Sequence, residues 1–387
     1  MQHFNMGGVP PIIFGPGRID RVAKIVNTHG GGRVLVIADS ILSKLGMCDR
    51  LAEILVAADI QFEMAADVFG EPKLHLIDQL AEQARAVGAR VIVGFGGGAA
   101  MDAAKVVATI APSGQQGDDF ALAVRPLPTD GLPAIAIPTT AGTGSEVTRT
   151  AVISKSSGAK IWFWGEELMY KQAVLDPELT LSLPPEVTAW TGIDAVAHAL
   201  EAVTSRSASP AGNLYGLEAL RILTESLPRA VEDGSDMHAR SRVLWASTIA
   251  GLALHNCNTH LGHNISHALG SLVRIHHGRA TGLALETSLP WLVKRSEGAE
   301  NYASAALAMG AEQTAEALPD VFSKLMRSCR IPAALPVECS SISPTALATE
   351  MQKDANIGMA KNAACKVDAE DFEELASLVL ERPSIDE

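Results

Sequence analysis

The sequence predicts two domains of different class, an α/β domain over residues 1–183 and an all-α domain over residues 184–387. The chain of 387 residues exceeds the roughly 250–300 residues at which a single hydrophobic core stops growing. In its first half, near-continuous apolar runs alternate with amphipathic stretches, which is typical of a parallel sheet covered by helices on both faces. After Pro184 and Pro185, long Ala- and Leu-rich segments follow at helical spacing, with few strand signals.

The elements of the first half follow one another in a regular order. Buried strands are predicted to span 33–39, 61–67 and 90–98, and a further strand begins at 132 and runs into a glycine-rich loop. Helices are predicted to span 48–60, 73–89 and 100–111. In the second half, helical patterns cover 192–204, 213–232, 239–256 and 302–310. This order predicts a Rossmann-like parallel sheet followed by a helical domain.

Composition limits the partners. The formal net charge of −13 repels phosphate backbones and anionic lipid surfaces, and the sequence has no compensating basic patch. No window approaches the roughly 20 uncharged apolar residues that a membrane span needs. We therefore expect no nucleic acid and no membrane, and a small molecule as the partner.

The five cysteines are odd in number, widely spaced and free of any C-x-x-C pair, which argues against a disulfide framework or a zinc ribbon. The N-terminus has no basic stretch followed by an apolar run, so it does not resemble a secretory signal. Both observations predict a cytoplasmic protein.

A glycine cluster lies between a predicted strand and a predicted helix, in the segment VIVGFGGGAAMDAAK (91–105). Glycines let the backbone approach a phosphate closely, and the free N–H groups at the following helix N-terminus favour negative charge. Four glycines fall within 94–98, more than a turn alone requires, so we expect Gly96, Gly97 and Gly98 to bind a pyrophosphate. The alternative is a tight turn without a ligand.

Asp39 ends the first predicted strand and precedes the glycine cluster, the reverse of the order in the ordinary Rossmann fingerprint. An aspartate at such a strand end accepts hydrogen bonds from an adenosine ribose and repels a 2′-phosphate, which favours NAD over NADP. The alternative is that Asp39 caps the next helix together with Ser40.

A second loop, PTTAGTGSEVT (138–148), carries the hydroxyls of Thr139, Thr140, Thr143 and Ser145 at the end of another predicted strand. A purely structural loop rarely needs so many hydroxyl donors together. Two such loops after two parallel strands predict a dinucleotide.

The histidines cluster at helical spacing. Asp194 and His198 are four residues apart on a predicted helix and so share a face, and His263 and His267 repeat that spacing, with His277 nearby. One carboxylate with several imidazoles suits Zn²⁺ or Fe²⁺. A single His-x-x-x-His pair is more often surface or core decoration, but two such pairs and a further histidine favour a metal site.

Four motifs carry a family resemblance: GGGAAMDAAK (96–105), PTTAGTGSEVT (138–148), DPELTLSLPPEVTAWTGIDAVAHALEA (176–202) and GHNISHALGSLVRIHHG (262–278). In order and spacing they resemble the iron-containing (group III) alcohol dehydrogenases across nearly the whole chain. The resemblance implies a dehydroquinate synthase-like architecture, a homodimer, and a metal, Fe²⁺ or Zn²⁺, held by Asp194, His198, His263 and His277. It places His267 beside the metal without binding it, near the substrate and the nicotinamide.

The resulting set of NAD contacts combines the residues argued above with two further positions: Asp39, Gly96, Gly97, Gly98, Asp102, Thr139, Thr140, Thr143 and Lys160. The sequence departs from the family in three places. Ala99 replaces the usual serine after the triple glycine, GEPK (70–73) replaces the common P-x-P-T, and His276 stands where proline often precedes His277.

The leading functional hypothesis is reversible NAD-dependent oxidation of a small alcohol, diol or hydroxy acid. A divalent metal would act as a Lewis acid on the substrate oxygen, and His267 would relay the proton to solvent. The alternatives are an NAD- and zinc-dependent lyase like dehydroquinate synthase, whose polyanionic substrate needs a basic cluster, and a metal-independent reductase like maleylacetate reductase. A metal-binding protein without redox activity would leave both glycine-rich loops unexplained.

Overall fold

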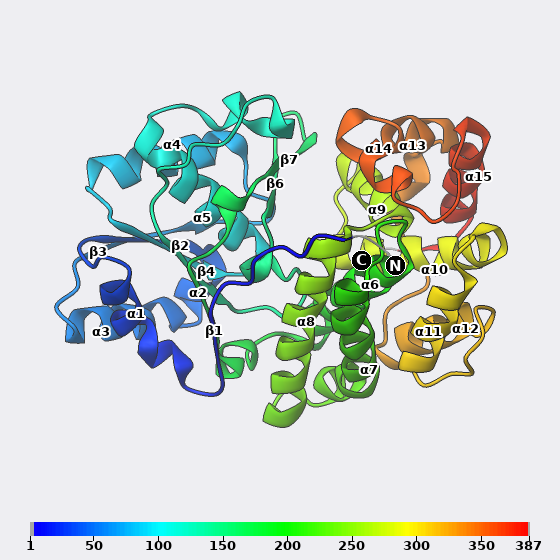
Figure 1. Cartoon of the computed structure of the whole chain (residues 1–387), viewed down its shortest axis with the longest axis horizontal. Coiled ribbons are helices and arrows are strands. Elements are labelled where there is room, and N and C mark those ends of the chain that lie inside the picture. The colour runs from blue at the N-terminus through cyan, green and yellow to red at the C-terminus, as the bar shows by residue number, and fades with distance from the viewer. Residues whose placement is uncertain (1–3, 386–387) are drawn as a thin grey trace. The chain divides into compact units, whose positions relative to one another are not determined.

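The computed structural model describes residues 4–385, which form two compact units (Figure 1). One unit is contiguous, from Gly8 to Ser182. The other contains the residues from Leu183 onward together with the described residues before Gly8. The N-terminal segment is held in this second unit at Gly7, whose backbone N–H donates to Asn256 Oδ1 at 2.9 Å.

The Gly8–Ser182 unit contains a six-stranded parallel sheet with the order β1-β8-β5-β4-β2-β3. Its strands, in chain order, are β1 (Ile12–Phe14), β2 (Val34–Asp39), β3 (Phe62–Val68), β4 (Val91–Gly96), β5 (Ala134–Pro138) and β8 (Gln172–Leu175). Residues of β2, β4 and β5 are almost all buried, as near-continuous apolar runs in a covered parallel sheet require. The predicted parallel sheet is confirmed.

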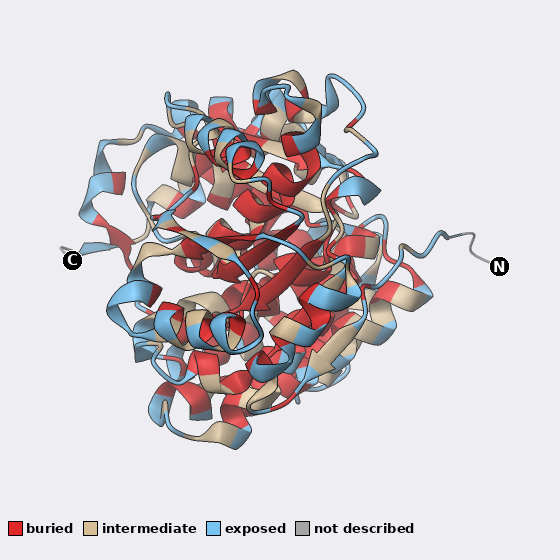
Figure 2. Cartoon of the chain, turned by 90° about the vertical axis from the view of Figure 1, so that its left-hand side faces the viewer, coloured by how far each residue is buried: buried red, intermediate tan, exposed pale blue. Residues whose placement is uncertain are grey.

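Helices cover both faces of this sheet (Figure 1). On one face, α1 (Val22–Thr28) and α3 (Met47–Ala57) share an apolar cluster with alternate residues of β2, β4 and β5. On the other, α5 (Gly98–Ile110) contacts the same three strands and packs against α4 (Leu74–Ala86). Figure 2 shows the buried strands running between helices whose outer sides are exposed. A short helix, α2 (Ser40–Lys44), follows β2 directly.

The chain reverses its direction of travel across the sheet at the edge strand β3, so the connections that leave β2 and β4 run in opposite directions. Strand β2 pairs with β3 on one side and with β4 on the other, so the crossover from β3 to β4 passes over β2. In open α/β sheets, ligands bind outside the carboxyl ends of the strands at such a switch point. Asp39 ends β2, and the glycine cluster begins at the end of β4.

Two further strands form a separate antiparallel hairpin in the same unit. Strand β6 (Thr150–Ser154) pairs with β7 (Lys160–Trp164). The hairpin lies against α5, which contacts β6.

The second unit is helical, as predicted. Its helices are α6 (Pro185–Thr204), α7 (Pro210–Glu232), α8 (Met237–Cys257), α9 (Leu261–Leu272), α10 (His277–Arg295), α11 (Ala299–Ala308), α12 (Ala317–Ser328), α13 (Pro344–Met351), α14 (Asp354–Lys361) and α15 (Ala369–Leu380). Helix α6 packs against α7, α8 and α10, and α9 packs against α10, α13 and α14. A two-stranded parallel pair, β9 (Leu335–Pro336) and β10 (Ser384–Ile385), completes the described part. Among residues 4–385, no helix has the length and apolar character needed to cross a membrane.

Candidate functional site

Helix α6 presents three functional side chains on one face. Asp194, His198 and Glu201 follow one another at spacings of four and three residues, which places them in line along the helix. The helix begins at Pro185, where the fixed proline backbone suits a first helical position. All three side chains are buried.

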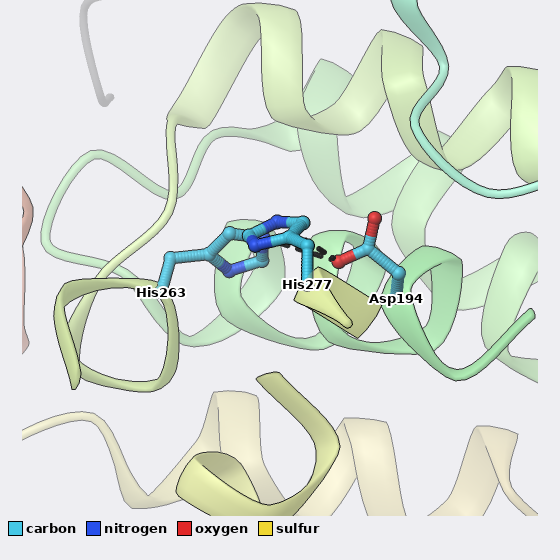
Figure 3. A group of neighbouring side chains, drawn as sticks. All are labelled: Asp194, His263 and His277. Carbon is cyan, nitrogen blue, oxygen red and sulfur yellow. Dashed lines mark ion pairs between the residues drawn. The ribbon is translucent and has the colours of Figure 1, made fainter. Parts of the chain in front are cut away.

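Two other helices bring histidines to this face. His263 and His267 lie four residues apart on α9, and His277 is the first residue of α10. Figure 3 shows the rings of His263 and His277 directed toward the carboxylate of Asp194. The Nε2 atoms of His263 and His277 lie 3.6 Å and 3.5 Å from Asp194 Oδ1. The structure therefore brings together three ligands that were far apart in the sequence, with ligand atoms all within 4.8 Å of one another.

His198 lies immediately beside this group. Its ring stacks on that of His263 with centroids 4.6 Å apart, and its Nε2 lies 4.0 Å from Asp194 Oδ2. The fourth predicted ligand therefore faces the second oxygen of the same carboxylate.

The charges of the group are strongly coupled. Burial raises the pKa of Asp194, but the surrounding imidazoles, His198 and His277 foremost, hold that pKa well below its usual range. Burial lowers the pKa of His263, but Glu201 and Asp194 on either side raise it to about 9. The centre thus holds an ionised carboxylate among imidazoles, which is a donor set for a divalent cation.

Two buried atoms show that the residues present fit a metal. Within the described part of the chain, Asp194 Oδ1 and His263 Nε2 are both shielded from solvent and have no hydrogen-bond partner. Buried polar atoms are almost always satisfied, so two unsatisfied atoms aimed at one point indicate a missing ligand. A cation coordinated by both would satisfy both.

His267 lies at the edge of the group. Its ring centroid is 5.2 Å from that of His277 and 6.1 Å from that of His263, and the residue is half-buried. It stands outside the set of three ligands, consistent with a role next to a metal.

His276 does not take the place of His277. It precedes α10 as the N-cap residue, and its ring packs against Trp190 with centroids 4.8 Å apart. Burial lowers the pKa of His276. The substitution of proline by histidine at this position leaves His277 facing Asp194.

Glu201 contacts the group and was not among the residues predicted from the sequence. Its Oε2 accepts a hydrogen bond from Nδ1 of His263, and its Oε1 accepts one from the backbone N–H of Gly262 at 2.6 Å. Burial raises its pKa, but the imidazoles of His260 and His263 and the hydrogen bonds lower it to about 2. The available signal was its position, seven residues after Asp194 and therefore on the same face of a helix.

The residues predicted to contact the pyrophosphate and the ribose of NAD lie at the carboxyl ends of β2 and β4. Asp39 Oδ2 accepts a hydrogen bond from the backbone N–H of Gly97 at 2.5 Å. Burial raises the pKa of Asp39, and the Gly97 hydrogen bond partly offsets this. Asp39 occupies the N-cap position of α2, but its side chain makes no capping hydrogen bond there.

The glycine cluster has no room for side chains. A Cβ at Gly96, whose φ is +151°, would lie 2.3 Å from Asp39 Oδ2. A Cβ at Gly98 would lie 2.6 Å from Thr143 Cγ2, and one at Gly97 would lie 3.4 Å from Thr140. The backbone at the start of α5 is thus in close contact with Thr140 and Thr143.

The second loop is tied to the first. The backbone N–H of Thr139 donates to the carbonyl of Gly96 at 2.9 Å, and Thr143 Oγ1 accepts from the backbone N–H of Ser145 at 3.3 Å. The structure therefore places Thr139, Thr140 and Thr143 around the glycine cluster.

Two of the predicted contact residues bind protein groups. Asp102 Oδ1 accepts from Ser145 Oγ at 2.6 Å, and Asp102 Oδ2 accepts from the Val152 N–H at 2.8 Å. Lys160 Nζ pairs with Glu71 Oε1 at 2.6 Å. Glu71 belongs to the divergent GEPK segment, which thus supplies the partner of Lys160.

The basic residues that a polyanionic substrate would need are engaged elsewhere. Arg149 pairs with Glu166 at 2.5 Å, and buried Arg279 donates to the carbonyl of Ala334 at 2.8 Å. Lys160 is likewise paired with an acidic residue, Glu71.

Comparison with known proteins agrees with the fold and the site. Residues 10–177 match the family "Iron-containing alcohol dehydrogenase", and residues 188–338 match "Fe-containing alcohol dehydrogenase family, C-terminal". The chain belongs to the iron-containing alcohol dehydrogenase family.

Three relatives illustrate the match. Sulfoacetaldehyde reductase of Bilophila wadsworthia is 34% identical over 286 residues, covering 74% of this chain and 73% of that protein. Long-chain-alcohol dehydrogenase 1 of Geobacillus thermodenitrificans is 37% identical over 279 residues, covering 71% and 70%. The crystal structure of sulfoacetaldehyde reductase from Bifidobacterium kashiwanohense in complex with NAD⁺ superposes with a TM-score of 0.89 at 26% identity, over 98% of this chain and all of that one. The protein is an oxidoreductase, and the lyase alternative is not favoured.

Proposed function

We propose that the protein is a metal-dependent, NAD-linked alcohol dehydrogenase or aldehyde reductase for a small alcohol, diol or hydroxy acid. The observation that carries this proposal is the convergence of Asp194, His263 and His277, with two buried ligand atoms left unsatisfied. The names of the relatives, which include reductases of an aldehyde and dehydrogenases of alcohols, support the substrate class.

The residues around the centre divide the chemistry among them. Asp194, His198, His263 and His277 would hold Fe²⁺ or Zn²⁺, which when bound supplies Lewis-acid polarisation of the substrate oxygen. His267, beside but outside the ligand set, would carry the proton between substrate and solvent. The burial of Asp194 and His263 excludes water from one side of the centre and strengthens its electrostatics.

The α/β unit would bind NAD, which supplies the hydride acceptor. Gly96, Gly97 and Gly98, at the start of α5, would receive the pyrophosphate. The carboxylate of Asp39 would face the adenosine ribose and disfavour NADP. Thr139, Thr140 and Thr143 would contact the cofactor directly, and Lys160 would do so from its pair with Glu71.

The contacts of Asp102 suggest that it acts on the cofactor through the loop. Both of its carboxylate oxygens are engaged by residues of the 145–152 segment, so it would hold that loop in place.

The cysteines bear on the compartment in which the protein works. All five cysteines are free and buried, which suits a reducing cytoplasm. By resemblance to its family, the protein would act as a homodimer.

The test is metal analysis of anaerobically purified protein together with an absorbance assay of NAD and NADP reduction over a panel of primary alcohols, diols and hydroxy acids. We expect about one equivalent of iron or zinc per chain and activity that a chelator removes and the metal restores. NAD should be used in preference to NADP. A metal-free protein that remains active would contradict the proposal and favour a metal-independent reductase.

Replacing His267 with alanine should separate proton transfer from metal binding. Because a positioned general acid–base contributes roughly 10²–10⁴-fold, we expect turnover to fall by about 100-fold or more while metal content stays near that of the wild type. Steady-state kinetics and metal analysis on the same preparation measure both quantities. Loss of the metal from this variant would show that His267 is a ligand.

A further inference from the structure

Glu201 is fully buried and placed behind the centre rather than in it. The atom of His263 that faces Asp194 is Nε2, whereas the atom that contacts Glu201 is Nδ1, on the opposite side of the ring. The imidazole of His263 is thus held between two carboxylates, one inside the metal group and one outside it. Glu201 does not belong to the set of possible ligands.

The other oxygen of Glu201 is bound to the start of helix α9. Oε1 accepts from the backbone N–H groups of Gly262 at 2.6 Å and His263 at 3.4 Å, which are the second and third residues of that helix. A carboxylate at a helix N-terminus is stabilised by unpaired N–H groups and by the helix dipole. One buried anion therefore fixes both the first turn of α9 and the ring that this turn carries.

His260 also lies beside Glu201, with its Nδ1 3.1 Å from Oε1, but its other contacts set a tautomer without a proton on that atom. Thr204 donates its hydroxyl proton to the Leu200 carbonyl at 2.8 Å, so it can only accept from Nε2 of His260, 2.9 Å away. The unprotonated Nδ1 of His260 then accepts from the Leu261 N–H at 2.8 Å. Glu201 receives donors from the helix and from His263.

We propose that Glu201 is a positioning residue for the metal centre: it keeps a proton on Nδ1 of His263, so that Nε2 is the ring atom that gives up its proton and binds the metal. It also adds a second buried negative charge in contact with the ligand set. The centre with a divalent cation, Asp194, Glu201 and neutral imidazoles is then electrically neutral, whereas a count of the direct ligands alone would give it a charge of +1. The inference rests on the proposed function, because it assumes that the Asp194 group binds a metal.

The Glu201→Gln variant tests this role. Its amide oxygen can still cap α9, but its NH₂ group then donates to Nδ1 of His263 and forces the ring proton onto Nε2, where it blocks the metal. If the amide rotates, its oxygen again accepts from Nδ1 of His263, but its NH₂ group then faces the Gly262 N–H, and two donors repel each other. We therefore expect the affinity of the metal-free protein for Zn²⁺, and for Co²⁺ followed by its visible absorption, to fall by about 10–100-fold.

The control is Glu350→Gln, which neutralises another buried carboxylate of the helical unit. Glu350 lies on α13 and pairs with Lys353, which follows that helix. The Zn²⁺ affinity of this variant should equal that of the wild type. If Glu201 only capped α9, the Gln variant would also bind Zn²⁺ normally, and that result would overturn the inference.

Failure of the proposed function gives a different result, because then the wild-type protein itself binds neither Zn²⁺ nor Co²⁺ in stoichiometric amount. Far-UV circular dichroism of each metal-free variant checks folding. Should Glu201→Gln not fold, Glu201→Asp replaces it, since its shorter side chain withdraws the carboxylate from Nδ1 while keeping the charge. Weaker Zn²⁺ binding is expected for this variant, and an unchanged affinity would contradict the role.

Discussion

Asn in place of Asp194 should abolish both metal binding and catalysis. Asp194 is the one carboxylate in the group, and both imidazole Nε2 atoms of His263 and His277 face its Oδ1. An amide keeps the shape of the side chain but removes the charge that attracts a cation. Loss of an outer-shell partner alone costs about 10–100-fold in metal affinity or activity, so loss of this ligand should cost at least about 100-fold in each.

Metal analysis and the NAD-linked assay on Asp194→Asn measure these losses, and NAD binding by fluorescence should remain unchanged, because the glycine cluster belongs to the Gly8–Ser182 unit. The matched control is Asp320→Asn, which alters an exposed aspartate on α12. Retention of a full metal equivalent by Asp194→Asn would show that the cation binds elsewhere.

The second large effect is expected on stability, at Lys105 of α5. This lysine is fully buried, and its Nζ donates to Thr148 Oγ1 at 3.1 Å and to the Thr150 carbonyl at 2.8 Å, with Asp102 Oδ1 3.9 Å away. Replacing it with methionine removes the donor to these two buried acceptors and the positive charge beside Asp102. Removing one member of a buried ion pair typically costs about 3–5 kcal/mol, a large part of the roughly 5–15 kcal/mol that stabilises a domain.

The effect of Lys105 on stability should also depend on pH. Burial lowers its pKa from the ordinary value of 10.5 to about 8, and Asp102 and Glu146 only partly oppose this. Between pH 8 and 10.5 the unfolded chain therefore binds more protons at this lysine than the folded chain does, so folding becomes more favourable as pH rises. The stability advantage of the wild type over Lys105→Met should grow across this window.

Urea unfolding of wild type and Lys105→Met at pH 7, 8 and 9 measures this difference. Lys155→Met, which removes an exposed lysine paired with Asp118 in the same unit, is the control. It should cost no more than about 1 kcal/mol. An advantage that shrinks with rising pH would mean that the fold favours the charged lysine.

Local patterns predicted four strands of the sheet well and missed the two at the β1 end. Strands β2, β4 and β5 are continuous apolar runs followed by clear helix or loop signals, so each can be predicted from its own local sequence. Strands β1 and β8 have three and four residues and were missed. They exist because Ile12 pairs with Ala173 in the folded sheet, and no local pattern reports a partner so distant along the chain.

The candidate site divides in the same way. The spacing of Asp194 and His198 on one helix face is local and was predicted from the sequence. That α6, α9 and α10 meet depends on packing, and only the family resemblance had implied it. Glu201 was missed because its proposed role depends on a contact with His263, 62 residues away along the chain. The local sequence around a glutamate on a helix does not report such a contact.

The helical unit is built from two separate stretches of the chain, and this affects the order in which its parts are synthesised. Its N-terminal segment, fixed at Gly7, leaves the ribosome 249 residues before its partner Asn256. At about 5–20 residues per second this is a delay of roughly 10–50 s. During that time the contiguous Gly8–Ser182 unit can complete its sheet. The helical unit cannot fold completely yet, because only its N-terminal segment has been synthesised. We therefore expect the sheet to fold first on the ribosome and the helices to fold last, around a segment that was translated before both.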